Sequence, residues 1–139
     1  MMTVAEQAQD IVDEFAFFDD WEDRYQHLID LGRKLPQLDE AFKTEEHRLR
    51  GCQSVVHFAA EYSDPVINFH AGSDAAIVQG LIAVMMRVYS GQKPADIIAT
   101  PPDFLHQIGL DEHLSPTRKN GLASMVTAIM TEAQKAAAS

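Results

Sequence analysis

The spacing of apolar residues changes along the chain from helical to alternating and back again. In the first third, apolar residues recur three and four positions apart, which places them on one face of an α-helix. The apolar positions of the two helices predicted there are Ala8, Ile11, Val12 and Phe15, and then Trp21, Tyr25, Leu28 and Ile29. We expect Asp19 and Asp20 to cap the second helix at its N-terminus and Gly32 to mark its C-terminal end.

The middle of the chain alternates with a period of two, which is the pattern of β-strands. One run covers residues 56–62, and a second places Ile67, Phe69 and Ala71 on one face. The polar turn Ser63-Asp64-Pro65 separates the two runs, so they predict an antiparallel hairpin. Residues 47–50 are a candidate for a short third strand.

The second half returns to helical spacing. Gly72-Ser73-Asp74 is a capping signal for a helix over residues 75–89, which is apolar on nearly all sides and is therefore predicted to be the buried central helix. Short helices are predicted over 94–99 and, with Asp103 as cap, over 104–108. Ser115-Pro116 predicts the start of a last helix, whose apolar stripe is Leu122, Met125, Val126, Ile129 and Met130. The predicted fold class is α+β: a small antiparallel sheet covered by helices.

Length and charge restrict the classes of function. The 139 residues predict one domain, residues 1–139, that can bury a core. A formal charge of −10 disfavours binding to nucleic acid or to an anionic membrane surface. The longest apolar stretch, residues 77–89, is too short to span a bilayer, and no basic residue precedes Arg24 as a leader segment would require. We therefore expect a cytoplasmic protein with neither nucleic acid nor membrane as partner.

Cys52 is the single cysteine of the chain. One thiol excludes an internal disulfide, a redox pair of cysteines and a zinc site with two or four cysteines. Its setting is locally basic and turn-like, with Arg48, Arg50 and Gly51 before it, and neighbouring positive charge favours the nucleophilic thiolate. A lone cysteine is also often an inert buried side chain. The residues by themselves leave both interpretations open.

Three segments in this order resemble the SufE family of sulfur-acceptor proteins, which includes the CsdE branch. They are Arg50-Gly51-Cys52-Gln53-Ser54 at the start of a strand, the stretch 72–81 that begins with Gly72-Ser73-Asp74, and the stretch 113–122 that contains Ser115-Pro116-Thr117-Arg118. The resemblance covers most of the chain and implies the fold shared by SufE proteins and iron–sulfur scaffolds. Those scaffolds hold a cluster with several cysteines, so the single Cys52 argues against a scaffold function.

The resemblance implies a function in sulfur transfer. A SufE-like protein accepts persulfide sulfur from a SufS- or CsdA-like cysteine desulfurase onto its cysteine, here Cys52, and stimulates the desulfurase by removing that sulfur. It relays the sulfur toward a cluster-assembly scaffold and acts as a carrier and activator rather than as a stand-alone enzyme. Pyridoxal phosphate belongs to the desulfurase, and no cofactor is expected on this chain. The chemistry agrees, because persulfide transfer is a thiolate attack on a sulfur–sulfur bond and needs one thiol.

Further residues are candidates for contacts around Cys52. Arg50 would lower the pKa of the thiol, meet an acidic partner or simply be solvated, and Gly51 would supply unusual backbone angles. The resemblance adds Gln53, Asp74 and Arg118 as loop or partner contacts, although a helix N-terminus by itself explains Asp74.

Two alternatives use the same cysteine differently. Cys52 could be a redox-sensing thiol that is oxidised or capped by glutathione, or an inert residue of an adaptor protein. His57 is predicted to be a strand residue on the polar face rather than a catalytic partner of the cysteine. The histidines show no metal-ligand spacing, so no metal is predicted.

Overall fold

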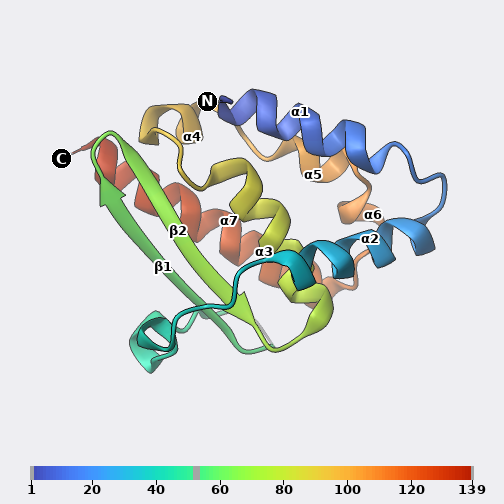
Figure 1. Ribbon diagram of the computed structural model, residues 1–139, viewed down its shortest axis with the longest axis horizontal. Helices are drawn as coiled ribbons and strands as arrows, with labels where there is room; N and C mark the ends of the chain where they lie inside the picture. Colours follow the sequence, from blue (N-terminus) through green and yellow to red (C-terminus); the bar gives the residue numbers. More distant parts are fainter. Residues whose placement is uncertain (1, 52–53, 139) are drawn as a thin grey trace.

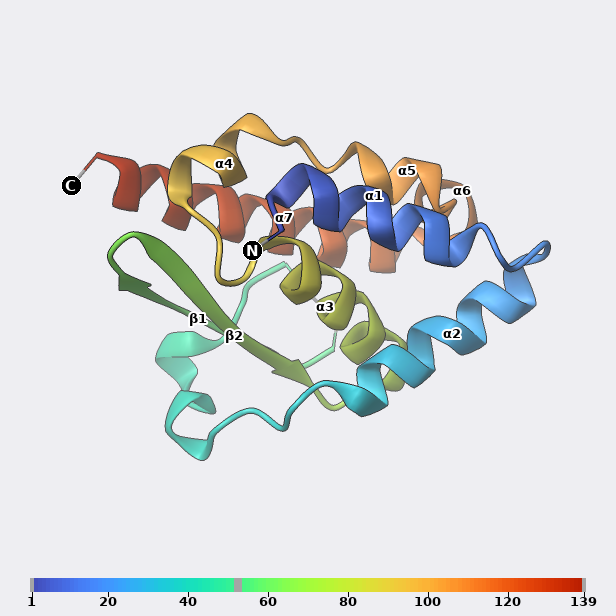
Figure 2. The ribbon, with the colours of Figure 1, turned by 45° about the horizontal axis from the view of Figure 1, so that its top comes forward.

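The computed structural model describes residues 2–51 and 54–138. The other helices and a hairpin surround the central helix α3 (Figures 1 and 2). Two helices, two short 3-10 turns, a two-stranded hairpin and five further helices follow one another along the chain. Their bounds are α1 Val4–Phe15, α2 Trp21–Lys34, η1 Glu40–Phe42, η2 Glu45–His47, β1 Val56–Ser63, β2 Val66–Ser73, α3 Ala76–Tyr89, α4 Pro94–Ala99, α5 Asp103–Gln107, α6 Leu110–His113 and α7 Pro116–Ala137. The α+β prediction is confirmed.

The two N-terminal helices form where the apolar spacing predicts them. Asp20 caps α2, since its Oδ1 accepts a hydrogen bond from the backbone N–H of Asp23 at 2.9 Å. The prediction that Gly32 ends α2 is wrong, because the helix continues to Lys34. Gly32 is buried against α3, where an added Cβ would lie 2.7 Å from the backbone nitrogen of Gly80. The glycine allows the two helices to approach each other closely.

The predicted hairpin is present. β1 and β2 pair antiparallel in a register that joins Val56 to Ser73 and Ser63 to Val66. Ile67, Phe69 and Ala71 are all buried on one face of β2, as the alternation predicts. The third strand over 47–50 does not form. A 3-10 turn occupies part of that segment, and only Arg48 makes an isolated bridge, to His57.

Helix α3 is the core of the molecule. Ten of its residues are buried, and it packs against α1, α2, β2 and α7. The expected capping by Gly72-Ser73-Asp74 is wrong in detail, since Ala75 is the N-cap and no side chain caps the helix. Ser73 Oγ instead accepts a hydrogen bond from the Ala75 N–H at 3.2 Å, which closes a local turn ahead of the helix.

The helices after α3 follow the proline and cap signals. α4 has the predicted bounds, whereas α5 starts at Asp103 itself and receives no side-chain cap from that residue. Ser115 caps α7, because its Oγ accepts a hydrogen bond from the Arg118 N–H at 3.3 Å. Within the described residues, no helix combines the length and the apolarity that crossing a bilayer requires.

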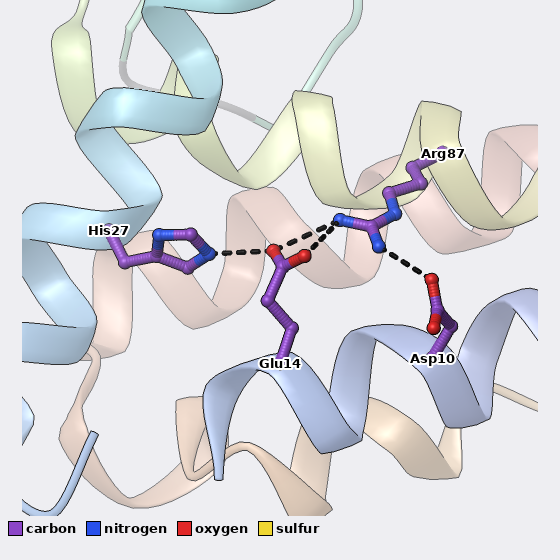
Figure 3. A network of polar contacts seen from close by, with 4 residues as sticks. All are labelled: Asp10, Glu14, His27 and Arg87. Atoms are coloured by element: carbon purple, nitrogen blue, oxygen red, sulfur yellow. Dashed lines mark hydrogen bonds and ion pairs between the residues drawn. The ribbon is translucent and has the colours of Figure 1, made fainter. Parts of the chain in front are cut away.

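A cluster of charged side chains ties the first three helices together (Figure 3). Arg87 of α3 donates to both carboxylate oxygens of Glu14, each at 3.0 Å, and to Asp10 at 2.8 Å, both of which lie on α1. His27 of α2 reaches Glu14 at 2.7 Å. Burial raises the pKa of Glu14, but the hydrogen bonds from His27 and Arg87 outweigh it, so the pKa is lower than usual. The ionised carboxylate therefore stabilises the contact between α1, α2 and α3.

Candidate functional site

A cavity of about 420 Å³ lies between α3, the first turns of α7 and the start of the hairpin. Val78 and Leu81 of α3 supply part of its apolar lining, together with Leu122 and Met125 of α7. Its polar lining comes from a different set: Ser54, Ser115, Thr117, Arg118 and Gly121. The cavity thus places apolar wall, hydroxyl groups and one guanidinium next to one another.

Of the described residues on either side of Cys52 and Gln53, one lines the cavity and the other lies against α7. Ser54 lines the cavity. Gly51 contacts α7, where an added Cβ would stand 2.5 Å from Oγ of Ser124. Cys52 and Gln53 themselves lie outside the described residues. Ser54 therefore lies at the cavity, and Gly51 lies against the same helix, α7, that lines one side of it.

The backbone of Gly51 adopts the unusual angles predicted for this glycine. Its φ is +87°, a left-handed value that side-chain-bearing residues rarely adopt. A Cβ here would meet the Ser124 hydroxyl, which can rotate away, so the backbone angle is the main reason for glycine at this position. Leu49 closes the base of the same loop by donating its N–H to the carbonyl of Val56 at 2.9 Å.

Arg118 is the candidate residue that the structure brings to the cavity. It is exposed in the first turn of α7, and no ion pair joins its guanidinium to a described carboxylate. A cation at a helix N-terminus opposes the helix dipole, so helix stability does not explain its presence. The Ser115 cap fixes the backbone that carries Arg118.

Arg50 and Asp74 do not line this cavity. The Arg50 guanidinium pairs with Glu45 at 2.8 Å, and both side chains are largely exposed, which makes this a surface ion pair of little energetic weight. Asp74 is exposed and lines a smaller cavity of about 280 Å³ together with Lys43, Val55 and His57. His57 lies on β1 and is partly buried.

Several lining residues were not expected from the sequence. Ser54, Val78 and Leu81 lie within the segments used for the resemblance, but nothing in their spacing indicates a cavity. Ser124, which does not line the cavity, also carries no local signal, since its contact is with Gly51, far earlier in the chain. Across 2–51 and 54–138, no three His, Asp or Glu side chains gather as a metal site would require.

Comparison with known proteins identifies the family of the chain. The family model of the SufE domain, described as an Fe-S metabolism associated domain, matches residues 9–133. An uncharacterised SufE-like protein of Rhizobium meliloti is 43% identical over 129 residues, which cover 89% of this chain and 92% of the relative. A second, from Rhizobium etli, is 46% identical over 134 residues, covering 92% and 90%.

A solved structure shows the same fold. The solution structure of a hypothetical protein from Thermus thermophilus superposes with a TM-score of 0.79 over the whole of both chains, at 21% sequence identity. At that identity the likeness concerns the fold alone. The family match and the two relatives place the chain in a class of proteins associated with iron–sulfur metabolism. The chain belongs to the SufE family.

Proposed function

We propose that this protein accepts sulfur from a pyridoxal-phosphate-dependent cysteine desulfurase and that the thiol of Cys52 carries it. Membership of the SufE family is the observation on which the proposal rests. Two features support it: Cys52 is the single thiol of the chain, and Ser54, two positions after it, lines the cavity between α3 and α7. Pyridoxal phosphate stays with the desulfurase, and this chain needs no cofactor of its own.

The transfer is a balanced exchange at sulfur. The Cys52 thiolate attacks the outer sulfur of the desulfurase persulfide, and a new sulfur–sulfur bond forms on Cys52. The bond between outer and inner sulfur of the donor breaks, and the desulfurase cysteine leaves as a thiolate. No external oxidant or reductant is required. Removing the persulfide frees the desulfurase for its next turnover, which is how the acceptor stimulates it.

A single cysteine suits this chemistry. A second thiol on the carrier would attack the new persulfide, form an internal disulfide and release the sulfur. The apolar wall of Val78, Leu81 and Met125 would shield a bound sulfur from free thiols and oxidants. The guanidinium of Arg118 at the same cavity would favour the anionic thiolate or persulfide.

The test is direct transfer followed by mass spectrometry. We expect the protein, incubated with a cysteine desulfurase, pyridoxal phosphate and cysteine, to gain the mass of one sulfur that a reductant removes. Cys52→Ser should gain none and should not stimulate alanine formation by the desulfurase. A matched control, Cys52→Ser combined with Ser54→Cys, moves the thiol two positions along the same loop and should accept sulfur poorly.

The same experiment separates the alternatives. A redox-sensing thiol would gain oxygen or glutathione under mild oxidation and no sulfur from the desulfurase. If the protein is an adaptor with an inert cysteine, the Cys52→Ser variant would stimulate the desulfurase as strongly as the wild type does. Equal sulfur gain by the wild type and Cys52→Ser would overturn the assignment to this residue.

The family description, iron–sulfur metabolism, supports a downstream step as well. We propose that the Cys52 persulfide is delivered to a cluster-assembly scaffold. Protein loaded with labelled sulfur and purified from the desulfurase should transfer the label to a scaffold protein. Retention of the label on Cys52 in the presence of the scaffold would contradict this step.

A further inference from the structure

Phe17 is far more exposed than any other large apolar residue in the described part of the chain. Its side chain is 87% exposed, whereas the next, Tyr62, reaches 47%. It lies in the connection between α1 and α2, which both views place at one extremity of the molecule (Figures 1 and 2). Isolated apolar residues on a surface are common, but a nearly fully exposed aromatic ring is the type of residue that anchors protein interfaces.

The backbone that carries Phe17 is held in place. Its N–H donates to the carbonyl of Glu14 at 3.3 Å, and that of Phe18 donates to Phe15 at 3.0 Å. The Arg24 side chain then donates to the carbonyl of Phe18 at 2.9 Å and to that of Ile108 at 3.1 Å. The ring is therefore presented from a fixed turn, which lowers the entropy lost when a partner binds it.

Carboxylates surround this turn. No Lys or Arg occurs before Arg24, and the two acidic residues paired with Arg87 face the helix cluster. The acidic residues nearest the turn are exposed, and none of them pairs with a described Lys, Arg or His: Asp13, Asp19, Asp20, Glu22 and Asp23. The helix dipole accounts for Glu22 and Asp23 in the first turn of α2, but it gives no reason for an exposed aromatic among them. We call residues 13–23 the acidic turn.

The acidic turn adjoins the elements that border the cavity. Trp21 stacks on His113 of α6 with ring centroids 4.6 Å apart and planes within 10°. Two residues later Ser115 caps α7 and lines the cavity. The acidic turn and the cavity thus both adjoin the junction between α6 and α7.

We propose that the acidic turn is a second docking contact for the cysteine desulfurase, one that inserts Phe17 into an apolar pocket rimmed by Lys and Arg. This inference rests on the proposed function, because the desulfurase enters through it. An aromatic ring within carboxylates complements an apolar pocket with a basic rim. The ring supplies affinity, and the carboxylates accelerate association.

The test compares binding and sulfur transfer with purified desulfurase as the probe. Phe17→Ser should raise the dissociation constant about tenfold, as loss of an interface anchor does. Asp13→Asn combined with Asp19→Asn should slow association and weaken its dependence on salt. The matched controls on α4, Ile98→Ser and Asp96→Asn, remove an exposed apolar residue and a charge elsewhere, and should leave both quantities unchanged. At saturating concentration, sulfur transfer to Cys52 should equal that of the wild type in every variant.

The outcomes separate this inference from the proposed function. Failure of the wild type to bind the desulfurase or accept sulfur would overturn the proposed function. If the wild type performs both while Phe17→Ser binds as tightly as Ile98→Ser, the docking contact alone is refuted. A wild-type dimer that Phe17→Ser abolishes, with desulfurase binding retained, would assign Phe17 to contact between copies of this chain and would also refute the inference.

Discussion

Replacing Gly80 with alanine tests how closely α2 and α3 pack. An added Cβ would lie 2.2 Å from the carbonyl oxygen of Leu28 and 2.6 Å from its carbonyl carbon. Both are backbone atoms, so a rotamer change cannot relieve the overlap. Restoring ordinary contact requires the helices to separate by about 1 Å.

The magnitude follows from two opposing effects. Overpacking a tight interface destabilises a protein by about 3 kcal/mol or more where backbone must move, and alanine in place of glycine returns about 1 kcal/mol of helix propensity. The net loss is about 2–3 kcal/mol. For a chain of 139 residues, an unfolding entropy of about 2.1 cal/mol/K per residue converts this loss into a Tm lower by about 8 °C.

Calorimetry or thermal unfolding followed by circular dichroism measures this shift. Gly32→Ala adds a Cβ to the same interface from α2, 2.7 Å from the nitrogen of Gly80. The double variant should therefore lose less stability than the sum of the losses of the two single variants. Thr127→Ala, at an exposed position of α7, gains propensity without a clash and should melt at or slightly above the wild-type temperature. A Gly80→Ala protein with unchanged Tm would refute the close approach of α2 and α3.

Three further predictions concern charge, capping and the cavity. The folded-state pKa of Glu14 lies below its ordinary value of 4.5. The ionised carboxylate therefore stabilises the fold fully above pH 4.5, and this stabilisation is lost as the pH falls through the lowered pKa. Unfolding free energies of wild type and Glu14→Gln should therefore differ at neutral pH and converge in acid. Ser115→Ala removes the α7 cap and should lower stability by about 1 kcal/mol, whereas Ser115→Asn should retain most of it. Arg118→Gln should leave Tm nearly unchanged and slow sulfur acceptance about tenfold, as loss of a charge-assisted contact does, while Lys119→Gln should leave the transfer rate unaffected. Equal rates for the two variants would remove Arg118 from the site.

Local patterns were sufficient for most of the elements and for naming Cys52 as the candidate reactive residue. Helix and strand periods depend on neighbours two to four positions apart, so α1, α2, the hairpin and α3 could be predicted with little error in their bounds. Caps at Asp20 and Ser115 are equally local, because each hydrogen bond spans three residues. Cys52 stood out because it is the one thiol of the chain.

The errors occurred where distant segments meet. Glycine is common at helix ends, but Gly32 is needed for another reason: the backbone of Gly80 on α3 lies too close to leave room for a side chain. Aspartate is a common N-cap residue, but the N-cap of α3 is Ala75 rather than Asp74. The cavity unites Ser54, α3 and the start of α7, and Gly51 lies against Ser124 of α7. Such contacts depend on how whole helices pack, and no spacing along the chain records which surfaces come together. The candidate residue for the proposed sulfur chemistry is thus identified from the sequence, whereas the cavity between α3 and α7 exists only once the helices have packed.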